Sequence, residues 1–149
     1  MVYTGIMVTK TTSVQDSLRW YRGANIPMRV IRNFARAVAD RFQPGKIILF
    51  GSYAYGKPHD DSDVDILVVM PARNELDMAF KIHSTLLPCF PLDILVNRPD
   101  DLKARLEKGD SFLTEIVSKG KVLYEQSHAR VGRESRRRLD RRPKARART

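Results

Sequence analysis

The chain has 149 residues, which is the length of one domain with a buried core. Its single cysteine, Cys89, excludes an internal disulfide, and the lack of a long apolar run excludes a transmembrane helix. The net charge of +10 is uneven, because residues 126–149 hold ten of the 27 basic residues and two of the 17 acidic ones, which leaves +2 for residues 1–125.

These features divide the chain into three segments. Residues 1–25 form an N-terminal segment, in which a short helix is expected over Ser13 to Arg22, and residues 26–125 form the folded domain. Residues 126–149 are a basic tail, predicted to be disordered because it has too little apolar content to offset its ordering entropy. Such a tail either attracts nucleic acid or an acidic partner without specificity, or is only a solubilising end. The N-terminus has no secretory signal pattern, so we expect a cytoplasmic protein.

Apolar spacing and turn residues predict the elements of the domain. Helices are expected over 28–42 and 75–87, then from a cap at Asp100 or Asp101 to 107, and from a cap at Asp110 or Ser111 to 118. Strands are expected over 46–50, 65–70, 92–96 and 121–124. In the second helix the spacing directs seven side chains toward the core: Leu76, Ala79, Phe80, Ile82, His83, Leu86 and Leu87.

The connection between the first two strands, residues 51–63, is unusual. It is too irregular for a standard crossover helix, and long irregular connections in compact domains tend to be functional. The sequence therefore predicts an α/β (α+β) fold with a mixed sheet and helices packed against it.

Three aspartates lie at the starts of apolar strands. Asp63 and Asp65 are two residues apart, so in a strand they project to the same face, and Asp93 lies near the start of the third strand. Carboxylates that meet repel one another unless a cation lies between them, and Mg²⁺ prefers such oxygen ligands. Three carboxylates can bind two metal ions, which clamp the attacking and leaving oxygens of a nucleotidyl displacement.

Gly51 and Ser52 follow the first strand directly. A glycine at this place lets the backbone turn tightly and lets a ligand approach. Ser52 is expected to cap a short helical turn over 53–55 that Gly56 closes, and the backbone N–H groups of such a turn can cradle a phosphate. One end of the sheet would then hold both a phosphate and a metal.

The stretch FGSYAYGKPHDDSDVDILVV, followed by PLDILV, resembles the signature of the minimal nucleotidyltransferases of the DNA polymerase β superfamily. The resemblance spans about residues 28–125 and implies a polymerase-β-like fold, ATP as donor and Mg²⁺, with two ions expected. It implies that Asp63, Asp65 and Asp93 are catalytic and bind metal, and that Gly51, Ser52 and Ser62 bind the nucleotide. Many relatives have Arg where this chain has Tyr55; Lys57, or an arginine of the helix over 28–42, is a candidate replacement.

Many such small proteins are antitoxins that pair with an all-helical HEPN toxin. The resemblance implies that this chain transfers AMP from ATP to a hydroxyl of that partner, expected to be a tyrosine. A small-molecule transferase that modifies antibiotics is an alternative enzyme. A non-catalytic antitoxin that acts by binding, or a nucleic-acid-binding module that uses the tail, is the alternative from another class.

Overall fold

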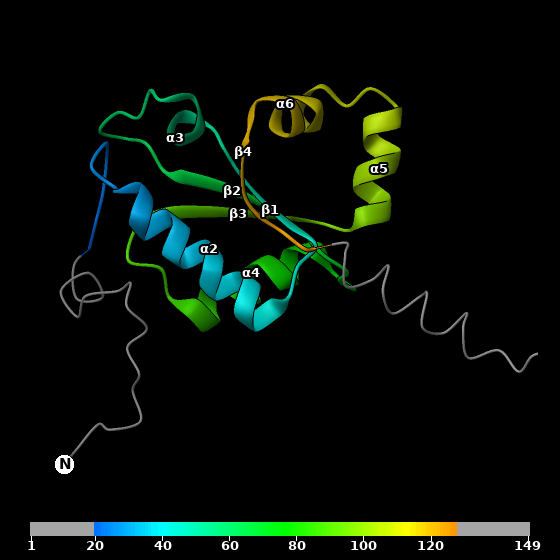
Figure 1. Ribbon diagram of the computed structural model, residues 1–149, viewed down its shortest axis with the longest axis horizontal. Coiled ribbons are helices and arrows are strands. Elements are labelled where there is room, and N and C mark those ends of the chain that lie inside the picture. Colours follow the sequence, from blue (N-terminus) through cyan, green and yellow to red (C-terminus); the bar gives the residue numbers. More distant parts are fainter. Residues whose placement is uncertain (1–19, 128–149) are drawn as a thin grey trace, which may run out of the picture.

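The computed structural model describes residues 20–127, which form a four-stranded sheet with helices on both of its faces (Figure 1). The spatial order of the strands is β3-β2-β1-β4, with β1 antiparallel to β2 and β4, and β2 parallel to β3. This confirms the predicted mixed sheet. The strands are β1 (Lys46–Phe50), β2 (Val64–Val69), β3 (Leu92–Asn97) and β4 (Lys121–Glu125).

One face of the sheet is covered by α2 (Met28–Phe42) and α4 (Glu75–Leu86). The buried side chains of α2 recur at helical spacing and meet alternate residues of β1 and β2, which places the larger core on this side. The larger core contains Ile31, Phe34, Val38, Ile47, Leu49, Ile66, Val68, Ile82 and Phe90, among others.

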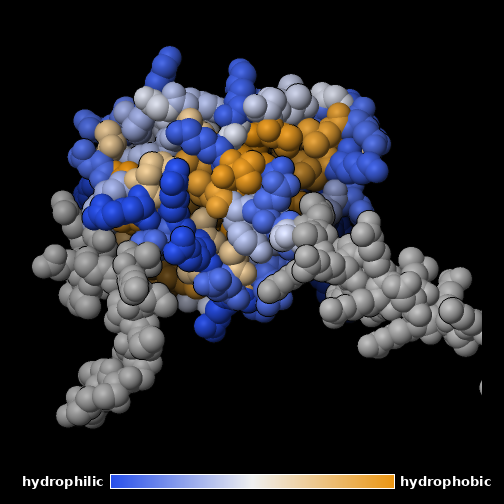
Figure 2. Space-filling view, viewed as in Figure 1, coloured by the Kyte–Doolittle hydropathy of each residue, from blue (hydrophilic) through white to orange (hydrophobic). Residues whose placement is uncertain are grey.

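The other face carries a smaller core beneath α5 (Pro99–Glu107) and α6 (Ser111–Lys119). Its buried members are Ile48, Leu67, Val69, Leu113 and Ile116. Figure 2 shows apolar side chains gathered where β4, α5 and α6 lie in Figure 1. The smaller core does not extend over the N-terminal ends of β2 and β3. Polar side chains at those ends can therefore face a ligand.

The prediction that all seven spaced side chains of α4 point toward the core is wrong for those on its outer side. Ala79 and Ile82 are buried as predicted, but Leu76 is 79% exposed, Phe80 76% and Leu87 74%. The helix has apolar side chains on two faces, and the sheet covers one of them. Periodicity shows where apolar residues recur but does not show which of two apolar faces meets the core.

Tyr21, which belongs to the N-terminal segment, is 4% exposed and packs in the larger core together with Ile26. Residues 20–22 are not helical, and the rest of the short helix expected over Ser13 to Arg22 lies outside the described residues. The basic tail lies outside them as well, apart from residues 126 and 127.

The element ends agree with the sequence to within one residue, except at the start of α5. Helix α5 begins after Arg98 instead of Asp100 or Asp101. At α6, the predicted cap holds, since Oδ1 of Asp110 accepts a 3.0 Å hydrogen bond from the backbone N–H of Leu113. Among residues 20–127, no helix has the length and apolar character needed to cross a membrane.

Candidate active site

Three strands place side chains of Phe50, Asp65 and Asp93 in one row across the sheet. Phe50 is opposite Asp65 in the antiparallel β1–β2 pair, and Asp65 is opposite Asp93 in the parallel β2–β3 pair. Side chains of directly paired residues lie on the same face. The next row, which contains Leu67, packs under α5 and α6, so the carboxylates are on that face of the sheet and beyond its smaller core.

Asp63 lies one residue before β2 begins, and its side chain is exposed, whereas Val64 is fully buried in the larger core. This alternation turns Asp63 and Asp65 to the same side of the chain. The structure therefore brings the two aspartates of the first pair together with Asp93, as the sequence predicts.

The electrostatics of Asp65 show how close the acids are. Burial first, then the neighbouring charges of Asp93 and Asp63 and a side-chain hydrogen bond to Asp93, together raise the pKa of Asp65 from 3.8 to about 6. Asp65 is thus the acid that has the least solvent and the most negative charge around it.

The three carboxylates fit a divalent cation by their chemistry, but they do not form a ready-made cage. No group of three or more His, Cys, Asp or Glu side chains within residues 20–127 is arranged so that it could hold a metal ion. Within the same range, Asp63, Asp65 and Asp93 make no salt bridge to Lys or Arg. Clustered carboxylate oxygens without a basic partner are the kind of ligand that Mg²⁺ binds.

Gly51 joins the carboxylates to the loop that follows β1. Its φ of 73° lies in the region that favours glycine, and a Cβ added there would collide with the carboxylate of Asp65, coming within 3.2 Å of its Cγ. The carbonyl of Gly51 accepts hydrogen bonds from the N–H groups of Ala54 and Tyr55, at 3.0 and 3.1 Å, which begins α3 (Ser52–Tyr55). The Gly-Ser and Asp-x-Asp parts of the motif are therefore in contact.

Ser52 does not cap this turn, which corrects the expectation from the sequence. Gly51 occupies the cap, and Ser52 is the first helical residue. Its hydroxyl instead donates a 3.1 Å hydrogen bond to Oγ of Ser62. The same Oγ accepts a 2.7 Å hydrogen bond from the backbone N–H of His59. Ser62 is 5% exposed, so this hydrogen bond ties Ser52 to a buried side chain.

Two residues that support the site could not be assigned from the sequence. The Tyr53 hydroxyl donates to the carbonyl of Gly23 and accepts from the N–H of Ile26 at 3.2 Å, which anchors α3 to the segment before α2. His59 has a structural part in the loop, because its Nδ1 accepts a 3.2 Å hydrogen bond from the N–H of Asp61. A buried tyrosine needs such a partner, but spacing does not say where the partner lies.

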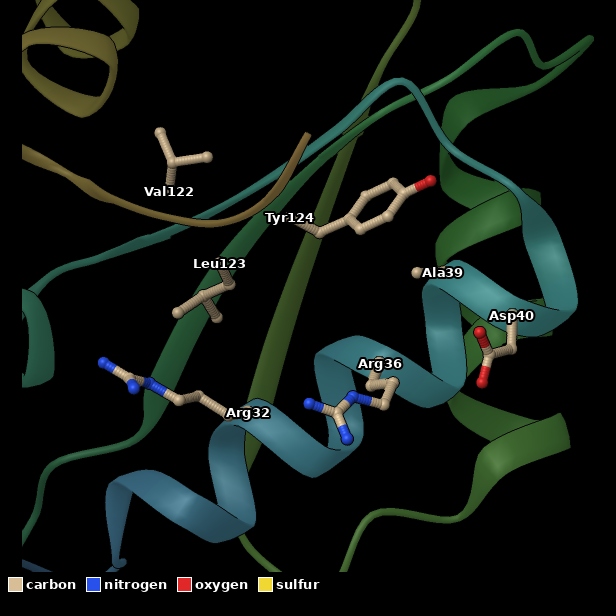
Figure 3. Close-up of a pocket in the computed structure, with 7 residues that line it drawn as sticks. All are labelled: Arg32, Arg36, Ala39, Asp40, Val122, Leu123 and Tyr124. Atoms are coloured by element: carbon tan, nitrogen blue, oxygen red, sulfur yellow. The ribbon is translucent and has the colours of Figure 1, made fainter. Parts of the chain in front are cut away.

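The arginines of α2 are not at the carboxylate row. Arg32 and Arg36 line a hollow of about 610 Å³ between α2 and β4, where Leu123 and Tyr124 face them (Figure 3). The lining of this hollow contains neither Gly51–Ser52 nor the aspartates. These arginines are therefore no replacement for the missing arginine at Tyr55, while Lys57 remains in the motif loop with an exposed side chain.

An aromatic pair borders the row on its other side. The rings of Phe50 and Phe112 meet edge to face with their centroids 5.9 Å apart, inside the range of about 4.5–7 Å that such pairs prefer. Phe112 comes from α6 and is 51% exposed, so an aromatic surface stands next to Asp65. Strand alternation and the β1–β2 register could have placed Phe50 beside Asp65, whereas the contact between Phe50 and Phe112 depends on how α6 packs on the sheet.

Comparison with known proteins agrees with this arrangement. Residues 33–129 match the family model described as Polymerase beta, Nucleotidyltransferase, and the chain belongs to this family of nucleotidyltransferases. A protein of Methanocaldococcus jannaschii that bears the name protein adenylyltransferase is 29% identical over 100 residues, which are 64% of this chain and 96% of that protein.

Two solved structures are similar at a lower level. A nucleotidyltransferase from Sulfolobus solfataricus has a TM-score of 0.44 and 18% identity, over 66% of this chain and 80% of that chain. The structure of a tri-AMPylated HEPN toxin from Shewanella oneidensis in complex with MNT antitoxin has a TM-score of 0.37 and 18% identity, over 75% of this chain and 92% of that chain. The family assignment rests on the match of the sequence to the family model.

Proposed function

We propose that this protein is a Mg²⁺-dependent adenylyltransferase that moves AMP from ATP to a hydroxyl, expected to be a tyrosine, of a HEPN-type toxin, and so acts as its antitoxin. The observation that carries the proposal is that Gly51 lies against the carboxylate of Asp65, which is paired with Asp93 across the sheet. That contact puts a backbone site for phosphate directly against a cluster of carboxylates.

The residues divide the work of the transfer. Gly51 leaves room for the triphosphate because it has no side chain, and the hydroxyl of Ser52, which donates to Ser62 in this structure, would turn to donate to a phosphate oxygen when the nucleotide binds. Asp63, Asp65 and Asp93 would hold two Mg²⁺ ions, which neutralise charge on the phosphates and the leaving group.

Asp93 is placed to take part in the bond-making step as a base. Its side chain is exposed at the start of β3, where an acceptor can approach. The acceptor oxygen forms a bond to the α-phosphorus of ATP while the bond to the β-phosphate oxygen breaks and pyrophosphate leaves. The proton of the hydroxyl passes to the carboxylate of Asp93, so charge and atoms balance.

Family membership and the named adenylyltransferase relative support protein as the acceptor class. Within residues 20–127 the fold is one sheet with its covering helices, and Asp93 is exposed at the start of the edge strand β3. A folded protein can bring its own surface to the open end of β3.

The experiment uses ATP labelled at the α-phosphate, Mg²⁺ and a purified HEPN-type protein as the candidate acceptor. We expect label on that protein with the wild type and none with Asp63→Asn, and we expect loss of labelling when the acceptor tyrosine is changed to Phe. Undiminished neutralisation of the toxin by Asp63→Asn would show that binding, not transfer, silences it, and would overturn the proposal.

The basic tail carries a smaller proposal, which is weak contact with nucleic acid. Residues 126–149 hold a net charge of +8, and attraction of this kind weakens with added salt. Binding of a fluorescent duplex DNA or RNA at 50 and 200 mM salt, by the wild type and by a tail with its arginines changed to Gln, tests it. Equal binding by both proteins would make the tail inert.

A further inference from the structure

The outer side of α4 carries an apolar stripe that the fold does not use. Its members are Leu76, Phe80 and His83 on the helix and Leu87 at its C-cap, all of them exposed. The opposite side of the same helix supplies Ala79 and Ile82 to the larger core. We name these four residues the outer stripe.

The spacing of the outer stripe is that of a helix–helix seam. Leu76, Phe80 and His83 follow one another at intervals of four and three, which places two apolar side chains and one imidazole on the same side of α4, and Leu87 follows at the C-cap in left-handed backbone with a φ of 46°. A hollow of about 460 Å³ lies along it, lined by Leu76, Asp77, Ala79, Phe80, His83 and Ile94. The hollow gives a partner side chain a place to enter.

The exposed area is large enough to form the centre of an interface. At the exposures of Leu76, Phe80 and Leu87, the three side chains present on the order of 400 Å² of apolar surface. One partner in a stable complex contributes about 800 Å², with an apolar centre and a polar rim. Asp77 stands in the lining of the hollow and supplies a negative charge for such a rim.

The position of the outer stripe connects it to the candidate active site. Ile94 lines the hollow, and the residue before it on β3 is Asp93, whose side chain points to the opposite face of the sheet. β3 is an edge strand of the described sheet, so no other strand separates the two faces there. A molecule seated on the outer stripe needs only to pass around one strand to reach Asp93.

We propose that the outer stripe docks a helix of the protein that accepts AMP. This inference rests on the proposed function and adds the surface that selects its substrate. The docked helix carries apolar side chains three and four residues apart and a Lys or Arg opposite Asp77. The continuity of the stripe with the edge of β3 favours the acceptor over a second copy, which would occupy the approach to Asp93.

The closing experiment compares two variants of the full chain. Leu76→Ser with Phe80→Ser removes the centre of the outer stripe, and Val117→Ser with Val122→Ser removes exposed apolar side chains of α6 and β4, near the opposite edge of the sheet. Thermal unfolding confirms that both variants are folded. The probe is the HEPN-type protein used as acceptor in the transfer assay, labelled with a fluorophore, and its binding is followed by anisotropy without ATP.

We expect the stripe variant to bind the probe about 30-fold more weakly than the wild type, as for loss of two central interface residues, and the control variant to bind within about twofold. Unchanged binding by the stripe variant, or equal loss in both variants, overturns the docking proposal. No binding by the wild type overturns it as well.

Transfer of labelled AMP is measured in parallel, so that the two proposals can fail separately. Binding that depends on the outer stripe without any transfer keeps the docking surface and overturns the proposed function. Transfer with equal efficiency by wild type and stripe variant, at probe concentrations below saturation, keeps the function and overturns the docking surface.

Two further outcomes name other occupants. If the wild type alone is a dimer by light scattering and the stripe variant is a monomer, a second copy covers the outer stripe and the proposal is overturned. If Leu76→Cys in the monomeric chain reacts with a maleimide no faster than the wild type, whose Cys89 gives the background rate, the chain covers its own stripe and the proposal is likewise overturned. Fast labelling supports it.

Discussion

Two aspartates of this domain sit in opposite surroundings, although both lie at the start of an element. Asp110 caps α6, and its pKa is lowered because its carboxylate accepts from the N–H of Leu113 and from the guanidinium of Arg105. Asp65 begins β2 beside two other acids, and burial first, then those charges, raise its pKa to about 6. The first site is satisfied by the fold itself, whereas the second lacks a positive partner among the described residues.

The contrast separates a residue that stabilises the fold from one that the fold holds at a cost. A carboxylate kept among like charges is unfavourable until a cation joins it, and such places are where function is expected. The same contrast holds within α4, whose inner apolar face is covered and whose outer one is not. Changes to Asp65, Gly51 and Asp110 test the comparison directly.

The largest expected effect is on catalysis. Asp65→Asn keeps the size of the side chain but removes a charge that the cation and the phosphates require, so adenylyl transfer should fall by about 10³-fold or more. Single-turnover transfer of labelled AMP at saturating ATP measures the loss. Asp100→Asn on α5, an exposed acid early in its element and outside the carboxylate row, is the control and should retain full activity. Equal activity of the two variants would contradict the role of Asp65.

The next effect concerns the contact between Gly51 and Asp65. Gly51→Ala introduces a Cβ where the carboxylate lies, so it should cost about 2–3 kcal/mol of unfolding free energy, from backbone strain and collision together. Gly56 is a matched control, because its φ of 75° is similar but nothing lies within 4 Å of an added Cβ. Gly56→Ala should cost about 1 kcal/mol. Equal losses in urea unfolding would show that the collision is relieved without cost.

Gly51 and the aspartates also show what the sequence can predict. Spacing alone put Asp63 and Asp65 on the same side of the chain and Asp93 near the start of another strand, because strand alternation and strand starts are local properties, whereas the pairing of β2 with β3 brings Asp93 beside them. The same local information gave the strands, the helices and the mixed sheet. It could not give the role of Ser62, whose hydroxyl meets Ser52 only after the motif loop folds back.

Tertiary packing accounts for the remaining differences. Leu76 and Phe80 have the same helical spacing as buried residues, and their exposure is decided by where α4 meets the sheet. The arginines of α2 were candidates for phosphate binding by charge, but the direction of that helix takes Arg32 and Arg36 to the hollow beside β4. Neither direction is encoded within one element.

The stability of Asp65→Asn should change with pH in a defined direction. Because the folded pKa of about 6 lies above the ordinary 3.8, the contribution of Asp65 to stability is fully present below pH 3.8 and is lost as the pH rises through about 6. At pH 7 without divalent cations, Asp65→Asn should therefore be more stable than the wild type by about 1 kcal/mol, after allowance for solvent screening.

At pH 4 the wild-type side chain is protonated and nearly identical in shape to Asn, so the two proteins should unfold at the same temperature. Thermal unfolding at both pH values, in the presence of a chelator, measures the difference. Added Mg²⁺ at pH 7 should stabilise the wild type and leave the variant unchanged. A variant that is less stable than the wild type at pH 7 would contradict the view that the fold holds Asp65 at a cost.

The smallest effect is expected at Asp110, and its sign is opposite. Its folded pKa lies below 3.8, so its contribution is present above pH 3.8 and is lost as the pH falls through the folded value. Asp110→Ala should lower the unfolding temperature by a few degrees at pH 7, because the N–H of Leu113 loses its acceptor, and by less at pH 3. Adenylyl transfer should not change.

Asp110→Asn divides this effect between the cap and the charge. Asn is as good an N-cap as Asp, so it keeps the hydrogen bond to the N–H of Leu113 but loses the ion pair with Arg105, whose Nη2 is 2.9 Å from Oδ2. The pair is largely exposed and should contribute little, so Asp110→Asn should stay close to the wild type while Asp110→Ala does not. If both variants lose the same stability, the charge and not the cap holds the start of α6, and Asp110 would resemble Asp65 in depending on its charged neighbours.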